Sequence, residues 1–142
     1  MIFTGDQILE ELKEIWPSFQ WEWPKNPNFA AMPDDMFPRV IEECSIKHMV
    51  NIPHIWECEN YSGRWQSNVE VYQYKLWQSG EYRPEWRWYV GDYTGTTSDF
   101  FGDPTTHSMN LIRLESGWIL FEPQTDVISK DFKSFTPFLG EA

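Results

Sequence analysis

The sequence predicts an α+β fold, because its helical patterns come first and its strand patterns follow. In the first half of the 142-residue chain, apolar residues recur at the three- and four-residue steps of amphipathic helices. From Trp86 onwards, β-branched and aromatic runs alternate with turn residues. Helices followed by an antiparallel sheet are typical of α+β domains. We therefore expect residues 1–142 to form a single domain, with N-terminal helices packed on a small antiparallel sheet.

The first predicted helix covers residues 6–15. Thr4 and Gln7 have the spacing of a capping box, and the helix ends before Pro17. The next stretch, residues 17–33, mixes prolines with aromatic residues, so we expect it to lie extended over the core. The side chains expected to make that contact are Phe19, Trp21, Trp23 and Phe29.

Two further helices are predicted. One covers residues 35–49 and has a single stripe of side chains, which consists of Phe37, Ile41, Cys44 and His48. The other lies between residues 55 and 78, where apolar positions step by three and four before Gly80. Residues 69–74 would equally suit a strand, but the longer-range periodicity favours the helix.

The second half of the chain predicts the sheet. Residues 86–93 are strand-like, and residues 93–105 form a loop rich in Gly, Thr and Asp. Residues 106–126 resemble two strands joined by a tight turn, so they predict a β-hairpin. The tail is expected to pack back on the body of the domain through Phe132, Phe135 and Phe138.

Charge and hydropathy exclude several classes of function. The formal net charge is −11 and no cluster of Lys and Arg is present, so nucleic acid is not expected as a partner. No run approaches the roughly 20 apolar residues that a membrane span needs. The N-terminus lacks the basic and apolar regions of a signal peptide, so we expect a cytoplasmic protein whose two cysteines are free thiols.

The thiol of Cys58 is the first candidate for chemistry. It lies in the first turn of the third predicted helix, where free backbone N–H groups and the helix dipole favour a thiolate. His107 is the only histidine remote enough in sequence to reach it as a base from another element. A third group would have to orient the imidazole. The alternative is that Cys58 is a small core residue and His107 an ordinary polar strand residue.

The hairpin register decides which acid lies near His107, because strand side chains alternate between two faces. A two-residue turn at residues 116–117 places Asp126 opposite His107, and local turn chemistry favours it. A four-residue loop at residues 114–117 places Glu122 diagonal to His107 on the same face. Either carboxylate could instead be a solvated group at a strand end, so the residues alone leave the acid open.

A zinc site is a second candidate. Cys44 with His48, and His54 with Cys58, form two sulfur–nitrogen pairs at the i, i+4 spacing of a helix. Two thiolates and two imidazoles suit tetrahedral zinc. This reading is less favoured, because the spacing is not a common zinc-finger pattern and Cys44 and His48 are already explained by the core stripe.

Three short motifs carry a resemblance to a known superfamily. Residues 58–62, Cys-Glu-Asn-Tyr-Ser, resemble the Cys-Asp-Asp-Phe-Ala helix start of small prokaryotic and phage proteins of papain-like or transglutaminase-like type. Residues 107–110 resemble their His-Ala-x-Asn strand, and residues 120–124 resemble their Leu-Ile-Glu-Pro-Gln strand end. The order of Cys, His and Glu is also similar to that in the papain-like C-terminal domain of fungal agglutinins. The resemblance covers roughly residues 55–126.

The resemblance implies a papain/transglutaminase-like fold and a cysteine hydrolase or acyltransferase. Cys58, His107 and Glu122 would be its catalytic triad, with Asp126 as second choice for the acid and with Asn110 and Gln124 in supporting positions. The thiolate would attack an amide or thioester carbon of a peptide or protein substrate. Calcium is implied as a possible cofactor, because the agglutinin domain uses it.

Two departures from these motifs leave open a divergent or catalytically inactive member of the family. Glu-Asn follows Cys58 where the family has two Asp, and Ser-Met follows His107 where it has Ala-Trp. Such changes suit a catalytically inactive interaction module of phage or bacterial origin that keeps the same fold. The nine tryptophans could also line an aromatic ligand platform, although tryptophan is more often a core residue.

Overall fold

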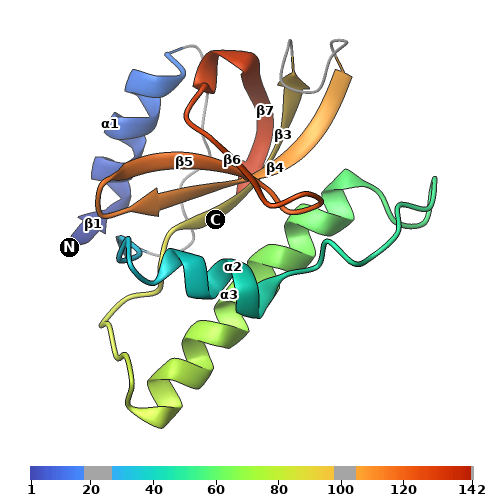
Figure 1. The fold of residues 1–142 in the computed structure, drawn as a ribbon. Coiled ribbons are helices and arrows are strands. Elements are labelled where there is room, and N and C mark those ends of the chain that lie inside the picture. The colour runs from blue at the N-terminus through green and yellow to red at the C-terminus, as the bar shows by residue number, and fades with distance from the viewer. Residues whose placement is uncertain (18–26, 98–104, 142) are drawn as a thin grey trace.

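Three layers make up the part of the chain that the computed structural model describes, which is residues 1–17, 27–97 and 105–141. The middle layer is a five-stranded antiparallel sheet. A small ribbon and helix α1 cover one face of this sheet, and helices α2 and α3 cover the other (Figure 1). The predicted α+β class is therefore confirmed.

The sheet has the strand order β6-β5-β4-β3-β7, and every neighbouring pair is antiparallel. Its strands are β3 (Val90–Thr97), β4 (Thr105–Leu114), β5 (Gly117–Glu122), β6 (Val127–Ser129) and β7 (Phe135–Glu141). The predicted hairpin is β4 with β5. Strand β7, which comes from the C-terminal tail, pairs with β3 and closes the opposite edge of the sheet.

The remaining elements lie outside the main sheet. They are β1 (Ile2–Thr4), α1 (Gly5–Ile15), β2 (Asn28–Ala30), α2 (Phe37–Cys44), α3 (Cys58–Ser79) and the short 3₁₀ helix η1 (Phe132–Ser134). Strands β1 and β2 form the two-stranded ribbon beside α1. None of the described helices combines the length and the apolar character needed to cross a bilayer.

Helix α1 forms as predicted. The Thr4 hydroxyl accepts the backbone N–H of Gln7 at 3.1 Å, and the Gln7 side chain accepts the N–H of Thr4 at 2.8 Å. This reciprocal pair satisfies two donors that the first turn would otherwise leave free. The predicted contacts of Phe19, Trp21 and Trp23 lie outside the described residues, whereas Phe29 is buried in β2.

Helix α2 is shorter than the predicted helix at residues 35–49. It ends at Cys44, and Ser45 turns into an extended conformation with ψ of 135°. Ile46, two residues after Cys44, has its side chain buried in the core. Burial of Ile46 outside the helical stripe stabilises the early end, because a buried side chain of this size contributes about 2 kcal/mol. His48, which was predicted on the stripe, is exposed beyond the helix.

Helix α3 confirms the helical alternative for the third segment. Its buried stripe consists of Tyr61, Trp65, Val69 and Leu76. The helix ends at Gly80, whose φ of 77° lies in the left-handed region that favours glycine. Residues 69–74 have strand-forming side chains. A strand, however, could not place Trp65, Val69 and Leu76 together on one buried face, whereas a helix does.

Two predictions about the second half are wrong in part. The loop predicted at residues 93–105 begins too early, because residues 93–97 continue strand β3 and pair with both β4 and β7; residues 98–104 lie outside the described part of the chain. In the tail, Phe135 is buried but Phe138 is exposed. These two side chains lie an odd number of residues apart on one strand and therefore point to opposite faces.

Two clusters of buried side chains hold the three layers together. One lies between the sheet and α2 and α3 and includes Trp65 and Phe121. The other lies between the sheet and α1 and includes Leu12 and Leu120. Phe121 and Leu120 are neighbours on β5, so the alternation of strand side chains supplies both faces of the sheet at once.

Candidate functional site

Cys58 is the first residue of α3, so its backbone stands at the helix N-terminus as predicted. The Asn60 side chain accepts the backbone N–H of Glu57 at 3.0 Å and closes this end of the helix. The thiol is half-buried, and it lies 3.5 Å from a carboxylate oxygen of Glu59.

The β4–β5 hairpin brings His107 and Glu122 together. Asn110 lies opposite Phe121 and Leu114 lies opposite Gly117, so residues 115–116 form the turn. This register places Glu122 diagonal to His107, as in the second of the two predicted registers, with a shorter turn than predicted. Nε2 of His107 is hydrogen-bonded to a carboxylate oxygen of Glu122.

His107 also interacts with the thiol, so the structure brings Cys58, His107 and Glu122 into one cluster. Burial lowers the pKa of His107, but hydrogen bonds to Cys58 and to Glu122 outweigh that effect and raise the pKa to about 9. Glu122 is almost fully buried, and its other carboxylate oxygen accepts the backbone N–H of Gln124 at 2.8 Å. The cluster therefore holds an imidazolium between two groups that stabilise its charge.

The other residues predicted near this cluster have different partners. Asp126, the second choice for the acid, forms an ion pair with Lys47 at 3.2 Å. The Asn110 side chain donates to the carbonyl oxygens of Ser62 at 2.9 Å and Gly91 at 3.1 Å, so it links α3 to β3. Gln124 contributes its backbone N–H to the cluster.

The predicted zinc set does not assemble. Cys44 is buried in the core between α2 and α3, where burial raises the pKa of its thiol to about 12. His48 and His54 are exposed on the loop that follows α2. Among the described residues, no group of three or more His, Cys, Asp or Glu side chains is arranged to hold a metal ion. Calcium binding, which the resemblance implied, stays a prediction.

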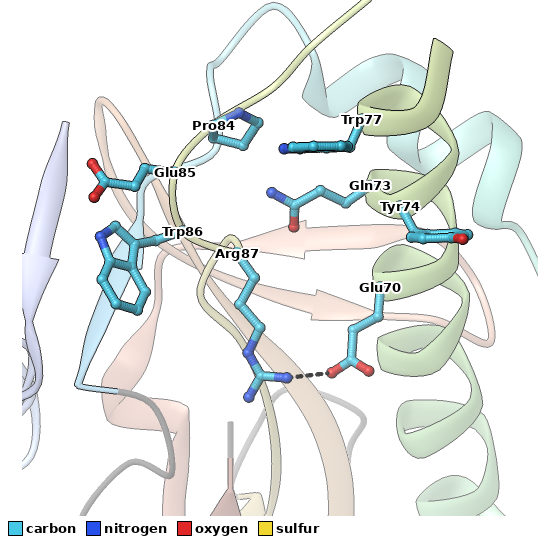
Figure 2. A pocket seen from close by; sticks show the side chains of 8 residues that line it. All are labelled: Glu70, Gln73, Tyr74, Trp77, Pro84, Glu85, Trp86 and Arg87. Atoms are coloured by element: carbon cyan, nitrogen blue, oxygen red, sulfur yellow. Dashed lines mark hydrogen bonds and ion pairs between the residues drawn. The ribbon is translucent and has the colours of Figure 1, made fainter. Parts of the chain in front are cut away.

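A second candidate site lies at the other end of α3. It is a pocket of about 320 Å³ between the helix and residues 84–87 (Figure 2). The helix contributes Glu70, Gln73, Tyr74 and Trp77. Trp77 and Tyr74 are 50% and 61% exposed, so both aromatic residues offer surface to a ligand.

Polar groups line the same pocket. Arg87 and Glu70 face each other from its two walls and form an ion pair at 3.0 Å (Figure 2). The Gln73 side chain extends from the helix into the space between the walls. Its carbonyl oxygen accepts the backbone N–H of Trp88 at 3.1 Å. Apolar surface with a few fixed polar groups is the composition of small-molecule binding pockets.

Sequence reasoning missed this pocket, although one signal was present. Tyr74 and Trp77 lie off the stripe of α3 that contains Trp65, Val69 and Leu76, so a helical prediction already places them on the outer face. The second wall could not be found in the same way, because it depends on how residues 84–87 return beside the helix.

Solved structures with a similar fold belong to a lectin. One is PSL1a in complex with E64, and another is Polyporus squamosus lectin bound to the human-type influenza-binding epitope Neu5Acα2-6Galβ1-4GlcNAc. Each has a TM-score of 0.76 and 14% sequence identity and covers 99% of this chain. The chain spans about half the length of these proteins, at 50% and 49%. No family model matches the chain, and no curated protein matches it in sequence.

These comparisons correct the family and the function predicted from the short motifs. The similar structures are those of a lectin, and no family model supports a papain-like or transglutaminase-like hydrolase. The prediction of a thiol protease or acyltransferase with a Cys-His-Glu catalytic triad is therefore wrong. That prediction rested on three motifs of four or five residues. Such short matches indicate where a helix starts and where strands end, but they do not establish the chemistry of a site.

The geometry of the cluster predicts unequal reactivity of the two thiols. We expect iodoacetamide to alkylate Cys58 faster than Cys44 at neutral pH, because Cys58 is partly exposed beside an imidazolium whereas Cys44 is buried. Replacement His107→Ala should slow the labelling of Cys58 and leave Cys44 unchanged. Peptide mass spectrometry over a time course measures both rates. Equal, slow labelling of the two cysteines would contradict an activated Cys58.

The raised pKa of His107 predicts a pH-dependent stability. A histidine whose pKa is higher in the folded state stabilises the fold below its unfolded pKa of about 6.5, and this contribution is lost as the pH rises through 9. We expect the free energy of unfolding in urea to fall by up to about 3 kcal/mol between pH 6.5 and pH 9. The variant His107→Gln should lose most of this dependence. A slope that is the same in both proteins would rule out the charged His107.

Proposed function

We propose that the chain is a catalytically silent interaction module that binds carbohydrate. The observation that carries this proposal is the pocket beside α3, where two exposed aromatic rings stand next to fixed polar groups. The lectin among the similar structures binds a glycan and supports the same class of ligand, although it is twice as long as this chain. A glycan thus takes the place of the peptide or protein partner expected from the sequence.

Carbohydrate suits this pocket for a physical reason. A pyranose ring has an apolar face of C–H groups and an edge of hydroxyl groups. The apolar face packs on an aromatic ring, which offers a large rigid surface at low entropic cost. Trp77 and Tyr74 provide such rings, and Glu70, Gln73 and Arg87 provide groups that exchange hydrogen bonds with hydroxyls.

The size and charge of the site agree with a small ligand. A volume of about 320 Å³ is at the lower end of the range of roughly 300 to 1,000 Å³ for ligand pockets. It therefore suits one or two sugar units better than a folded partner. The net charge of −11 gives no electrostatic support for nucleic acid.

We also propose that Cys58, His107 and Glu122 act as one polar cluster. Its support is the hydrogen bonding of His107 to both other members, with Glu122 held in turn by Gln124. In this role the cluster fixes the N-terminus of α3 against the β4–β5 hairpin, and the thiol keeps its reactivity toward alkylating agents.

The proposal predicts that glycan binding depends on Trp77. We expect the full chain to bind a simple glycoside in a titration followed by calorimetry or NMR. Replacement Trp77→Ala should weaken binding by about fivefold, because a stacked ring contributes roughly 1 kcal/mol beyond its buried area. Trp77 is half-exposed, so this variant should fold normally.

Phe138→Ala is the matched control, because it also removes a largely exposed aromatic ring but lies on strand β7, away from the pocket. It should leave the affinity unchanged. Failure of the native chain to bind any tested glycan at millimolar concentration would overturn the proposed function. Equal loss of binding in both variants would show that the pocket is not the site.

A further inference from the structure

We propose that the ligand is a linear oligosaccharide that lies across the outer face of α3 and occupies two pockets, one on each side of the helix. This inference rests on the proposed function and adds the class of ligand. The first pocket is the one between α3 and residues 84–87, which we call the Trp77 pocket. The second borders α2, and we call it the Lys75 pocket.

The Lys75 pocket is the larger of the two, with a volume of about 450 Å³ against about 320 Å³. Helix α3 contributes most of its lining, and Glu43 of α2 contributes the rest. The Asn68 side chain donates to the carbonyl oxygen of Cys44 at 3.3 Å, so the two helices that border this pocket are linked. The Lys75 pocket is therefore a fixed feature of the helix pair.

Two cations that line the Lys75 pocket, Arg64 and Lys75, are free in the part of the chain that the structure describes. Neither forms an ion pair or a side-chain hydrogen bond there, with Glu43 or with any other residue. The other four arginines of the chain each have a hydrogen-bond or ion-pair partner. The N–H donors of Arg64 and Lys75 can therefore bind ligand oxygens without breaking an existing bond.

Hydroxyl groups suit the Lys75 pocket because it presents both donors and an acceptor. Arg64 and Lys75 only donate hydrogen bonds, whereas the carboxylate of Glu43 only accepts them. A hydroxyl group does both, so the hydroxyls of one sugar can satisfy all three side chains.

An apolar ridge joins the two pockets across α3. Val71 lines the Lys75 pocket and is 52% exposed, whereas Tyr74 and Trp77 line the Trp77 pocket. These three residues are spaced three apart, so each is a neighbour of the next on the helix surface. Figure 2 shows the Tyr74 ring extending across the helix, away from residues 84–87. A ligand that leaves the Trp77 pocket over Tyr74 therefore reaches Val71 and the Lys75 pocket.

A linear oligosaccharide matches the length and the pattern of this surface. Its units repeat an apolar face of C–H groups and an edge of hydroxyl groups, and the surface has an apolar ridge between two polar pockets. The Trp77 pocket holds one or two units. Because neighbouring side chains such as Tyr74 and Val71 are only about 5–6 Å apart at Cβ, a third or fourth unit lies over the Lys75 pocket.

The test compares single sugars with chains of the same sugar in calorimetric titrations. The probes are the methyl glycosides of glucose, N-acetylglucosamine and galactose, each with its β1-4-linked tetrasaccharide. We expect at least one tetrasaccharide to bind the native chain about tenfold or more tightly than its single unit, with one molecule bound per chain. The reason is that contact with the second pocket becomes intramolecular once the first pocket is occupied.

The double variant Arg64→Ala/Lys75→Ala removes the two free cations. The tetrasaccharide should bind it about tenfold more weakly, whereas the affinity of the single sugar for the Trp77 pocket stays unchanged. Both residues are exposed, so this variant should fold normally. The matched control is Lys130→Ala/Lys133→Ala, which removes the same charge from two exposed residues that line neither pocket. It should leave both affinities unchanged.

The outcomes separate this inference from the proposed function. If single sugars bind through Trp77 but no tetrasaccharide binds more tightly, the glycan-binding function stands and the extended site is overturned. Equal weakening of the tetrasaccharide by the double variant and by its control also overturns the extended site. If neither single sugars nor tetrasaccharides bind, the proposed function fails and this inference fails with it.

Discussion

The packing of α3 on the sheet is the constraint on which the rest of this structure depends. Trp65 is fully buried, and the centroid of its ring lies 4.4 Å from the ring centroid of Phe121 on β5. Close by, Asn110 donates to backbone oxygens of α3 and β3, so the helix is fixed along its axis as well as against the sheet. A hydrogen-bonded polar group in a core specifies one register, because a shifted helix would leave it unpaired.

That fixed helix explains why the two candidate sites have such different chemistry. Its N-terminus places Cys58 beside the hairpin that holds His107, where the helix dipole favours negative charge. Nineteen residues further along, Trp77 stands on the outer face and borders a pocket closed by residues 84–87. Because a helix rises by about 1.5 Å per residue, the two sites are several helical turns apart. A substitution in one site therefore makes no contact with the other.

Elements with strong local patterns could be predicted from the sequence, and elements that depend on distant partners could not. The capping box of Thr4 and the buried stripe of α3 identify their helices by themselves. Strand β7 could not be found, because it becomes a strand only by pairing with β3. The early end of α2 depends on the burial of Ile46, and the pocket depends on the return of the chain near Trp86. Neither contact leaves a local pattern.

The cluster of Cys58, His107 and Glu122 shows how a site can be located from sequence while its function is not. Local sequence patterns predict the start of α3 at Cys58, the strand that contains His107 and the strand end at Glu122. The three side chains therefore meet as a consequence of the fold. Their meeting has a structural effect in its own right, because a buried carboxylate such as Glu122 is costly unless a charged partner satisfies it. His107 supplies that partner and ties the hairpin to α3. Function has to be argued from surfaces that a ligand can reach, and the exposed rings of Tyr74 and Trp77 form such a surface.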